Sequence, residues 1–166
     1  SHAHIDGGTS NPGYLTDGTS LEAYAQYNNG TLTFYYDKMK NSRAGNKYAL
    51  NNDKEPPGWY DDGNYKNVTQ VEFDPSFNEA RPQSTYFWFN SMTKLTSVTG
   101  LEYLNTSGVH TMRAMFYDCS SLEELDLGSF DTDGSLEVLE IPDEPDKIAK
   151  TFQEGGYSWT FYINPE

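Results

Sequence analysis

Residues suited to acid–base, nucleophilic or metal chemistry are few and scattered in this sequence. The three histidines are His2 and His4 near the start and His110 in a turn-like segment, and Cys119 is the single cysteine. No Gly-rich phosphate loop, nucleophile elbow, HExxH pattern or CxxC pair accompanies them. We therefore predict a non-enzymatic protein with no catalytic residues, no metal site and no cofactor.

One acidic segment resembles part of a calcium-binding loop. Asp131 and Asp133 precede Gly134, but the twelfth position from Asp131, where such a loop needs a closing glutamate, holds Pro142. We interpret this segment as a turn.

Aromatic side chains are the remaining candidates for ligand binding. Trp59 and Tyr60 lie in a polar stretch between a Pro-Pro-Gly turn and two aspartates, where an exposed ring could stack on a sugar or enter a partner surface. Alternatively, Trp59 packs onto the first repeat and caps it. Tyr35 is the third candidate, because alternation along its strand either exposes it or buries it. Trp88 and Trp159 are interpreted as core or cap residues.

Composition restricts the partners. The 166 residues carry a formal net charge of -14, which opposes nucleic acid and anionic lipid surfaces. The apolar fraction is 36%, but 15% of residues are aromatic, so aromatic side chains must supply much of the core. No run of 18 or more apolar residues occurs, and the sequence thus predicts no membrane-spanning segment.

An internal repeat organises the middle of the chain. Residues 89–95 recur 27 positions later as residues 116–122, Val71 precedes Val98 by the same step, and Trp88 aligns with Met115. Cys119 aligns with Met92 and is therefore interpreted as a small buried hydrophobe. A fixed period of this length is typical of stacked supersecondary units.

Each repeat unit is expected to contain a short strand and a short helix. The strand carries alternating apolar residues, and residues 111–117 place Met112, Met115 and Phe116 on one helix face, with residues 84–90 as the counterpart. We predict an α+β repeat fold, a short leucine-rich-repeat-like solenoid with a parallel strand ladder. An N-terminal β-hairpin and a C-terminal helix–strand segment would cap it.

The sequence MFYDCSSLEELDLGSFDT, residues 115–132, resembles the BspA-like surface leucine-rich repeats, and the resemblance extends from about residue 22 to residue 132. It implies a secreted or surface-anchored bacterial protein, with adhesion to host proteins such as fibronectin. The pattern stops after Gly134, where the family would continue with another helix.

The predicted organisation has four parts: a flexible lead (1–20), an N-terminal β cap with a long loop (21–67), two to three leucine-rich-type repeats (68–134) and a C-terminal cap (135–166). Asn29-Gly30 predicts a hairpin between two strand-like runs, and one further short strand is expected near residues 47–50. In the C-terminal cap we predict a strand at 135–141, a helix at 146–154 with Asp146 as N-cap and Gly155-Gly156 as its stop, and a strand at 158–163.

These observations lead to a functional hypothesis. The chain is expected to be a monomeric extracellular or bacterial cell-surface adhesion module, which binds a host extracellular or cell-surface protein, or a glycan, through its sheet face and adjoining loops. The alternatives are a carbohydrate-binding module that uses exposed Trp and Tyr residues, and a structural spacer of a larger surface protein.

Overall fold

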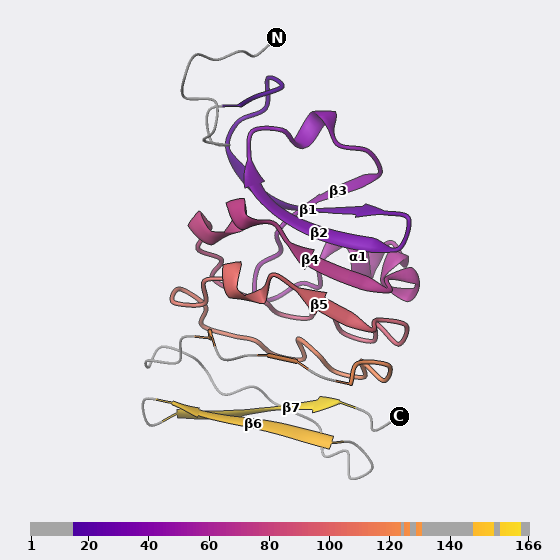
Figure 1. Cartoon of the computed structure of the whole chain (residues 1–166), viewed down its shortest axis with the longest axis vertical. Coiled ribbons are helices and arrows are strands. Elements are labelled where there is room, and N and C mark those ends of the chain that lie inside the picture. Colours follow the sequence, from indigo (N-terminus) through magenta and orange to yellow (C-terminus); the bar gives the residue numbers. More distant parts are fainter. Residues whose placement is uncertain (1–14, 124, 127–128, 131–147, 155–156, 164–166) are drawn as a thin grey trace.

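A computed structural model describes residues 15–123, 125–126, 129–130, 148–154 and 157–163. Within these residues the main feature is one mixed five-stranded sheet in the order β3-β1-β2-β4-β5 (Figure 1). Its strands are β1 (Glu22–Asn28), β2 (Thr31–Asp37), β3 (Asn46–Ala49), β4 (Gln70–Phe73) and β5 (Ser97–Thr99). A separate antiparallel pair comprises β6 (Ile148–Glu154) and β7 (Tyr157–Ile163).

The predicted N-terminal hairpin is confirmed. β1 and β2 pair antiparallel along their whole length, and Asn29 and Gly30 between them have φ angles of 49° and 85°. A two-residue turn with both φ angles positive suits the right-handed twist of the strands, and Asn-Gly tolerates it at low cost. β3 lies near the predicted residues 47–50 and pairs with the other edge of β1. The lead is ordered earlier than expected, because the backbone N–H of Asp17 donates to the carbonyl of Lys38 (3.1 Å).

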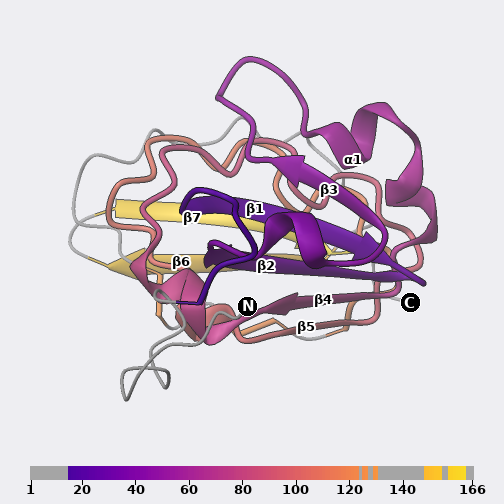
Figure 2. The same ribbon diagram turned by 90° about the horizontal axis from the view of Figure 1, so that it is seen from above.

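The 27-residue register is confirmed where the strands are parallel. β4 pairs with β5 so that Val71 lies opposite Val98, and an isolated parallel bridge joins Ser84 to Thr111. β2 in turn pairs with β4 in parallel, which attaches the N-terminal hairpin to the repeated part of the chain. Figure 2 shows the parallel strands on one side of the molecule and the turn segments that follow them on the other.

The helical part of the predicted solenoid is wrong. Among the described residues the single α-helix is α1 (Gly58–Asp61), a four-residue turn that the sequence reasoning assigned to a loop. Four 3-10 turns accompany it: η2 (Lys40–Ser42), η3 (Asn64–Asn67), η4 (Pro75–Glu79) and η5 (Leu101–Tyr103). The described part of the chain is thus mostly a mixed sheet with short turns, not a ladder of strands and helices.

Residues 84–92 and 111–119 form consecutive turns because positive φ angles interrupt any helix. Phe87 and Ser91 both have φ of 63°, and 27 residues later Ala114 and Asp118 have 56° and 61°. Alternate N–H groups then donate to the neighbouring unit, as Phe89 does to the carbonyl of Met115 (2.8 Å). Bonds between units replace the i to i−4 bonds that a helix needs. Stacking of the units, a long-range effect, therefore decided the backbone conformation here.

The predicted C-terminal helix at 146–154 is also wrong, because residues 148–154 form strand β6 paired with β7. Ile148, Thr151 and Phe152 favour strands, and a Gly-Gly pair between two such runs is also a hairpin signal. The predicted strand at 158–163 lies within β7 and is confirmed. The expectations for residues 135–141, for the N-cap Asp146 and for the acidic turn at Asp131 and Asp133 lie outside the described residues.

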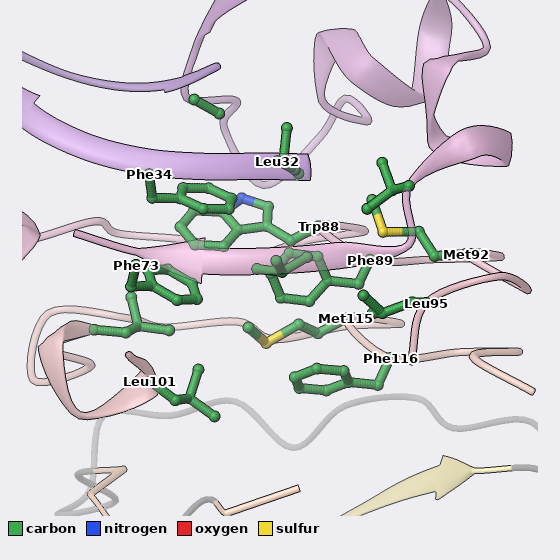
Figure 3. Close-up of a cluster of buried hydrophobic side chains, with 14 of the residues drawn as sticks. Leu32, Phe34, Phe73, Trp88, Phe89, Met92, Leu95, Leu101, Met115 and Phe116 are labelled. Carbon is green, nitrogen blue, oxygen red and sulfur yellow. The ribbon is translucent and has the colours of Figure 1, made fainter. Parts of the chain in front are cut away.

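Aromatic rings form the centre of the core, as the composition indicated. Phe34 of β2 stacks on Phe73 (ring centroids 4.6 Å apart) and on Trp88 (4.8 Å), between the sheet and the turn segments (Figure 3). Met115 and Phe116 are fully buried, as the repeat predicted, although their segment is not helical. Cys119 is buried too, and its thiol donates to the carbonyl of Phe89 (3.1 Å), which agrees with its interpretation as a packing residue.

Candidate functional site

Trp59 lies in the core and not on the surface. Its side chain is 0% exposed, and its Nε1–H donates to the carbonyl of Trp88 at 2.6 Å. Its ring packs edge-on against Phe34, with centroids 5.6 Å apart. The helical turn α1 therefore buries Trp59 against the first repeated turn segment. This is the capping arrangement, and it leaves no ring face of Trp59 for a ligand.

Tyr60, the next residue of α1, belongs to a half-buried cluster that we call the aromatic patch: Tyr60, Tyr65, Tyr86 and Phe87. Tyr60 and Tyr65 stack almost parallel, with centroids 4.4 Å apart, and Phe87 meets the Tyr60 ring edge-on at 5.4 Å. The ring centroids of Tyr86 and Phe87 lie 4.5 Å apart. Burial, assisted by nearby negative groups, raises the pKa of Tyr60 above its usual value. Its hydroxyl thus stays a neutral donor.

Phe87 holds its ring in this patch from an unfavourable backbone position. Its φ of 63° is uncommon for a bulky L-residue and costs roughly 1–2 kcal/mol. Ala114, one repeat later, has the same conformation with a minimal side chain, so the fold does not need a ring there. Because the positive φ recurs with the repeat, stacking of the units accounts for the conformation, and what is particular to this position is the bulky ring.

Tyr35 lies on the outer face of the sheet, the face turned away from the core, but it is covered. Arg43 places its guanidinium carbon 3.4 Å from the centre of the Tyr35 ring, and Tyr24 stacks beside that ring at 5.6 Å. Arg43 also donates to the Tyr24 hydroxyl (2.6 Å) and to the Asp37 carboxylate (2.5 Å). Burial and the hydrogen bond to Asp37 raise the pKa of Tyr24. We call Tyr24, Tyr35, Asp37 and Arg43 the closed end of the outer face.

The other end of the same face is polar and less internally paired. Pairing aligns Thr33 of β2, Glu72 of β4 and Thr99 of β5 in one row across the three parallel strands. Of the described carboxylates on the outer face, Asp37 pairs with Arg43 and Glu22 with Lys40 (2.9 Å), whereas Glu72 has no ion-pair partner among the described residues. Free polar groups on the outer face thus gather toward β5.

His110, which the sequence places in a turn-like segment, contacts the loop that precedes α1. Its Nε2 lies 3.1 Å from a carboxylate oxygen of Asp53, and both side chains remain more than a third exposed. The hydrogen bond from His110 lowers the pKa of Asp53. The same loop is held more firmly by Asn51, whose amide oxygen accepts from the Trp88 indole N–H (2.9 Å) and whose amide nitrogen donates to the carbonyl of Tyr86 (2.9 Å).

Tyr60 was predicted as a candidate from the sequence, whereas the three rings around it were not. The available signal was Phe87, which the 27-residue alignment places opposite the small Ala114. The described residues contain no group of three or more His, Cys, Asp or Glu side chains arranged to hold a metal ion. Among the same residues, no helix has the length and hydrophobicity needed to cross a membrane.

Comparisons with protein-family models, with curated proteins and with solved structures gave no significant match.

Proposed function

We propose that this chain is a non-enzymatic binding module of the extracellular space or bacterial cell surface, and that it binds a host protein through the aromatic patch. The observation that carries the proposal is the half-buried Phe87 ring, held at positive φ among Tyr60, Tyr65 and Tyr86. The resemblance of residues 115–132 to surface leucine-rich repeats supplies the cellular context.

The physical chemistry of the patch supports this role. Tyrosine and phenylalanine offer large contact areas with few rotatable bonds, and tyrosine is enriched among residues that dominate binding energy. The patch also rests on a rigid base, because the neighbouring Trp59 is anchored to the Trp88 carbonyl. A preorganised surface loses little conformational entropy on binding.

Two alternative functions predict different binding behaviour. A carbohydrate-binding module would use the tyrosines of the patch, because Trp59 is buried. A structural spacer would bind neither protein nor glycan. The same set of measurements therefore separates all three functions.

The test is binding of the purified chain to immobilised fibronectin and other host matrix proteins, in parallel with a glycan array. We expect saturable protein binding that weakens about tenfold or more in Tyr60→Ala and less in Tyr60→Phe, since truncation of a central tyrosine costs at least 1–2 kcal/mol. Tyr117→Ala, which alters a half-buried tyrosine in another turn segment, is the control. Glycan binding without protein binding would favour the carbohydrate module, and no binding in either assay would favour the spacer.

A further inference from the structure

Two tyrosines of the aromatic patch form a closely stacked pair. The ring centroids of Tyr60 and Tyr65 lie 4.4 Å apart, and the ring planes differ by 18°. This separation is at the short end of the usual range for aromatic pairs, so carbon atoms of the two rings lie near van der Waals contact. Both side chains are half-buried, and solvent therefore reaches the pair.

A short reversal of the chain brings the two rings together. Tyr60 lies in α1 and Tyr65 in η3, and Gly63 between these turns has φ of 86°. The N–H of Gly63 donates to the carbonyl of Tyr60 (3.1 Å). Tyr48 of β3 supports the segment, because its hydroxyl donates to the carboxylate of Asp62 (2.7 Å). The stacking is thus built into the fold of this segment.

A second stacked tyrosine pair among the described residues provides a contrast. The ring centroids of Tyr24 and Tyr35 lie 5.6 Å apart, with ring planes at 28°. Tyr24 is 0% exposed, and Arg43 covers Tyr35 with its guanidinium carbon 3.4 Å from the ring centre. The Tyr24 hydroxyl also donates to Asp37 (2.6 Å). This pair is more widely spaced, and the fold closes it to external reagents.

Two accessible phenols in contact can be joined by oxidation. When each phenol loses one electron and one proton, two phenoxyl radicals result, and their unpaired spin spreads to the ring carbons next to the C–O carbon. A bond forms between two such carbons, and the hydrogens on those carbons then move to the two oxygens, which gives dityrosine. One hydrogen peroxide takes up the two electrons and two protons and becomes two waters. Rings already held together react without a diffusional encounter, which favours the coupling strongly.

We propose that Tyr60 and Tyr65 are an oxidative cross-linking site, at which a haem peroxidase with hydrogen peroxide joins the two rings as dityrosine. The described tryptophans, Trp59 and Trp88, are 0% exposed, so they compete poorly for the oxidant. No atom lies within 4 Å of the position that a Cβ would take at Gly63, which leaves the segment room to adjust as the bond forms. The bond ties α1 to η3. This inference goes beyond the binding function proposed for the patch and does not depend on it.

The test treats the purified chain, at low concentration, with a haem peroxidase and hydrogen peroxide, and then digests it with trypsin for mass spectrometry. Tyr60 and Tyr65 lie in one tryptic peptide, residues 55–66. We expect this peptide to lose two hydrogen atoms and to show dityrosine fluorescence. A protease that cuts before aspartate should then leave the two halves of the peptide joined, because Asp61 and Asp62 lie between the two tyrosines.

Conservative variants and a synthetic peptide are the controls. Tyr60→Phe and Tyr65→Phe keep an aromatic ring but lack one phenol, and each should reduce the product by at least about tenfold. Tyr103→Phe, at a half-buried position outside the patch, is the matched control and should stay within about twofold. The synthetic peptide 55–66 has the same two tyrosines without the fold, and should give about fivefold less intramolecular product.

Several results would overturn the proposal. One is an unchanged peptide 55–66 under conditions in which the same oxidant dimerises free N-acetyltyrosine. Equal coupling of Tyr24 to Tyr35 would mean that spacing and exposure do not control the reaction. Product that joins only separate chains would contradict the intramolecular pair. Equal yield from the synthetic peptide would mean that closeness in the sequence, and not the fold, directs the coupling.

Discussion

The two ends of the outer sheet face begin from the same strand alternation and finish differently. At the closed end the chain returns after β2 and places Arg43 over Tyr35, where it also satisfies Asp37 and Tyr24. At the β5 end, Ser97, Thr99 and Glu123 border a hollow and make no such pairing within the described structure. Strand alternation alone thus decides which side chains point outward, and a loop decides which of them a partner can reach.

The aromatic residues that were candidates for ligand binding also differ in their exposure. Tyr35 points outward yet is covered, Trp59 lies in a polar stretch yet is fully buried, and Tyr60 is half-buried. The three aromatic candidates therefore have three different structural outcomes.

The largest expected loss of stability comes from a substitution in the core, which supports both ends of the sheet. Met115→Asp places a carboxylate at a fully buried position, where an unpaired charge costs several kcal/mol. We expect loss of the cooperative thermal transition, measured by circular dichroism. Ser107→Asp, at an exposed position, should unfold like the parent protein. A folded Met115→Asp protein would contradict the assignment of this residue to the core.

Arg43→Ala tests the closed end directly. The substitution leaves the Asp37 carboxylate, 3% exposed, without its cation, and we expect the free energy of unfolding to fall by about 2–4 kcal/mol. Urea denaturation measures it, and adding Asp37→Asn should restore part of the loss. Glu123→Gln at the β5 end should change stability by less than about 0.5 kcal/mol. Similar losses at both ends would remove the contrast between them.

Alkaline pH should act through the half-buried Tyr48. Burial, and then the hydrogen bond from Tyr48 to Asp62, raise the pKa of Tyr48 to about 12, above its usual value of 10.0. The folded state therefore favours the protonated phenol, and this stabilisation is complete below pH 10 and is lost as the pH rises through about 12. Absorbance at 295 nm should show a late ionisation step that Tyr48→Phe diminishes. An unchanged titration in that variant would refute the prediction.

The smallest expected effect concerns the turn segments. Ala114 has φ of 56°, which glycine adopts without strain, so Ala114→Gly should raise the free energy of unfolding by up to about 1 kcal/mol. Ala80→Gly, at φ of -75°, should lower stability instead because the unfolded chain gains freedom. Differential scanning calorimetry compares the thermal stability of the two variants with that of the parent protein. Destabilisation by both would mean that positive φ is not costly in these turns.

Local sequence signals predicted the parts of the fold that depend on neighbouring residues. Asn29-Gly30 predicted the hairpin because only a few residue types accept two successive positive φ angles. The 27-residue recurrence predicted the pairing of Val71 with Val98, because equal units stack in equal register. The helix prediction at 111–117 was wrong because the spacing of Met112, Met115 and Phe116 suits burial in consecutive turns as well as burial on one helix face. Their burial alone therefore does not distinguish a helix from consecutive turns.

The sequence by itself therefore determined the hairpin, the repeat register, the aromatic core and the acidic net charge, all of which follow from local propensity, periodicity or composition. The tertiary structure alone decided the conformation of the turn segments and the exposure of the candidate rings. The reason is physical: N–H groups of the turns bond to carbonyls 26 residues further along the chain, and Arg43 reaches Tyr35 across a loop. Neither contact can be predicted from the residues that surround the affected position in the sequence.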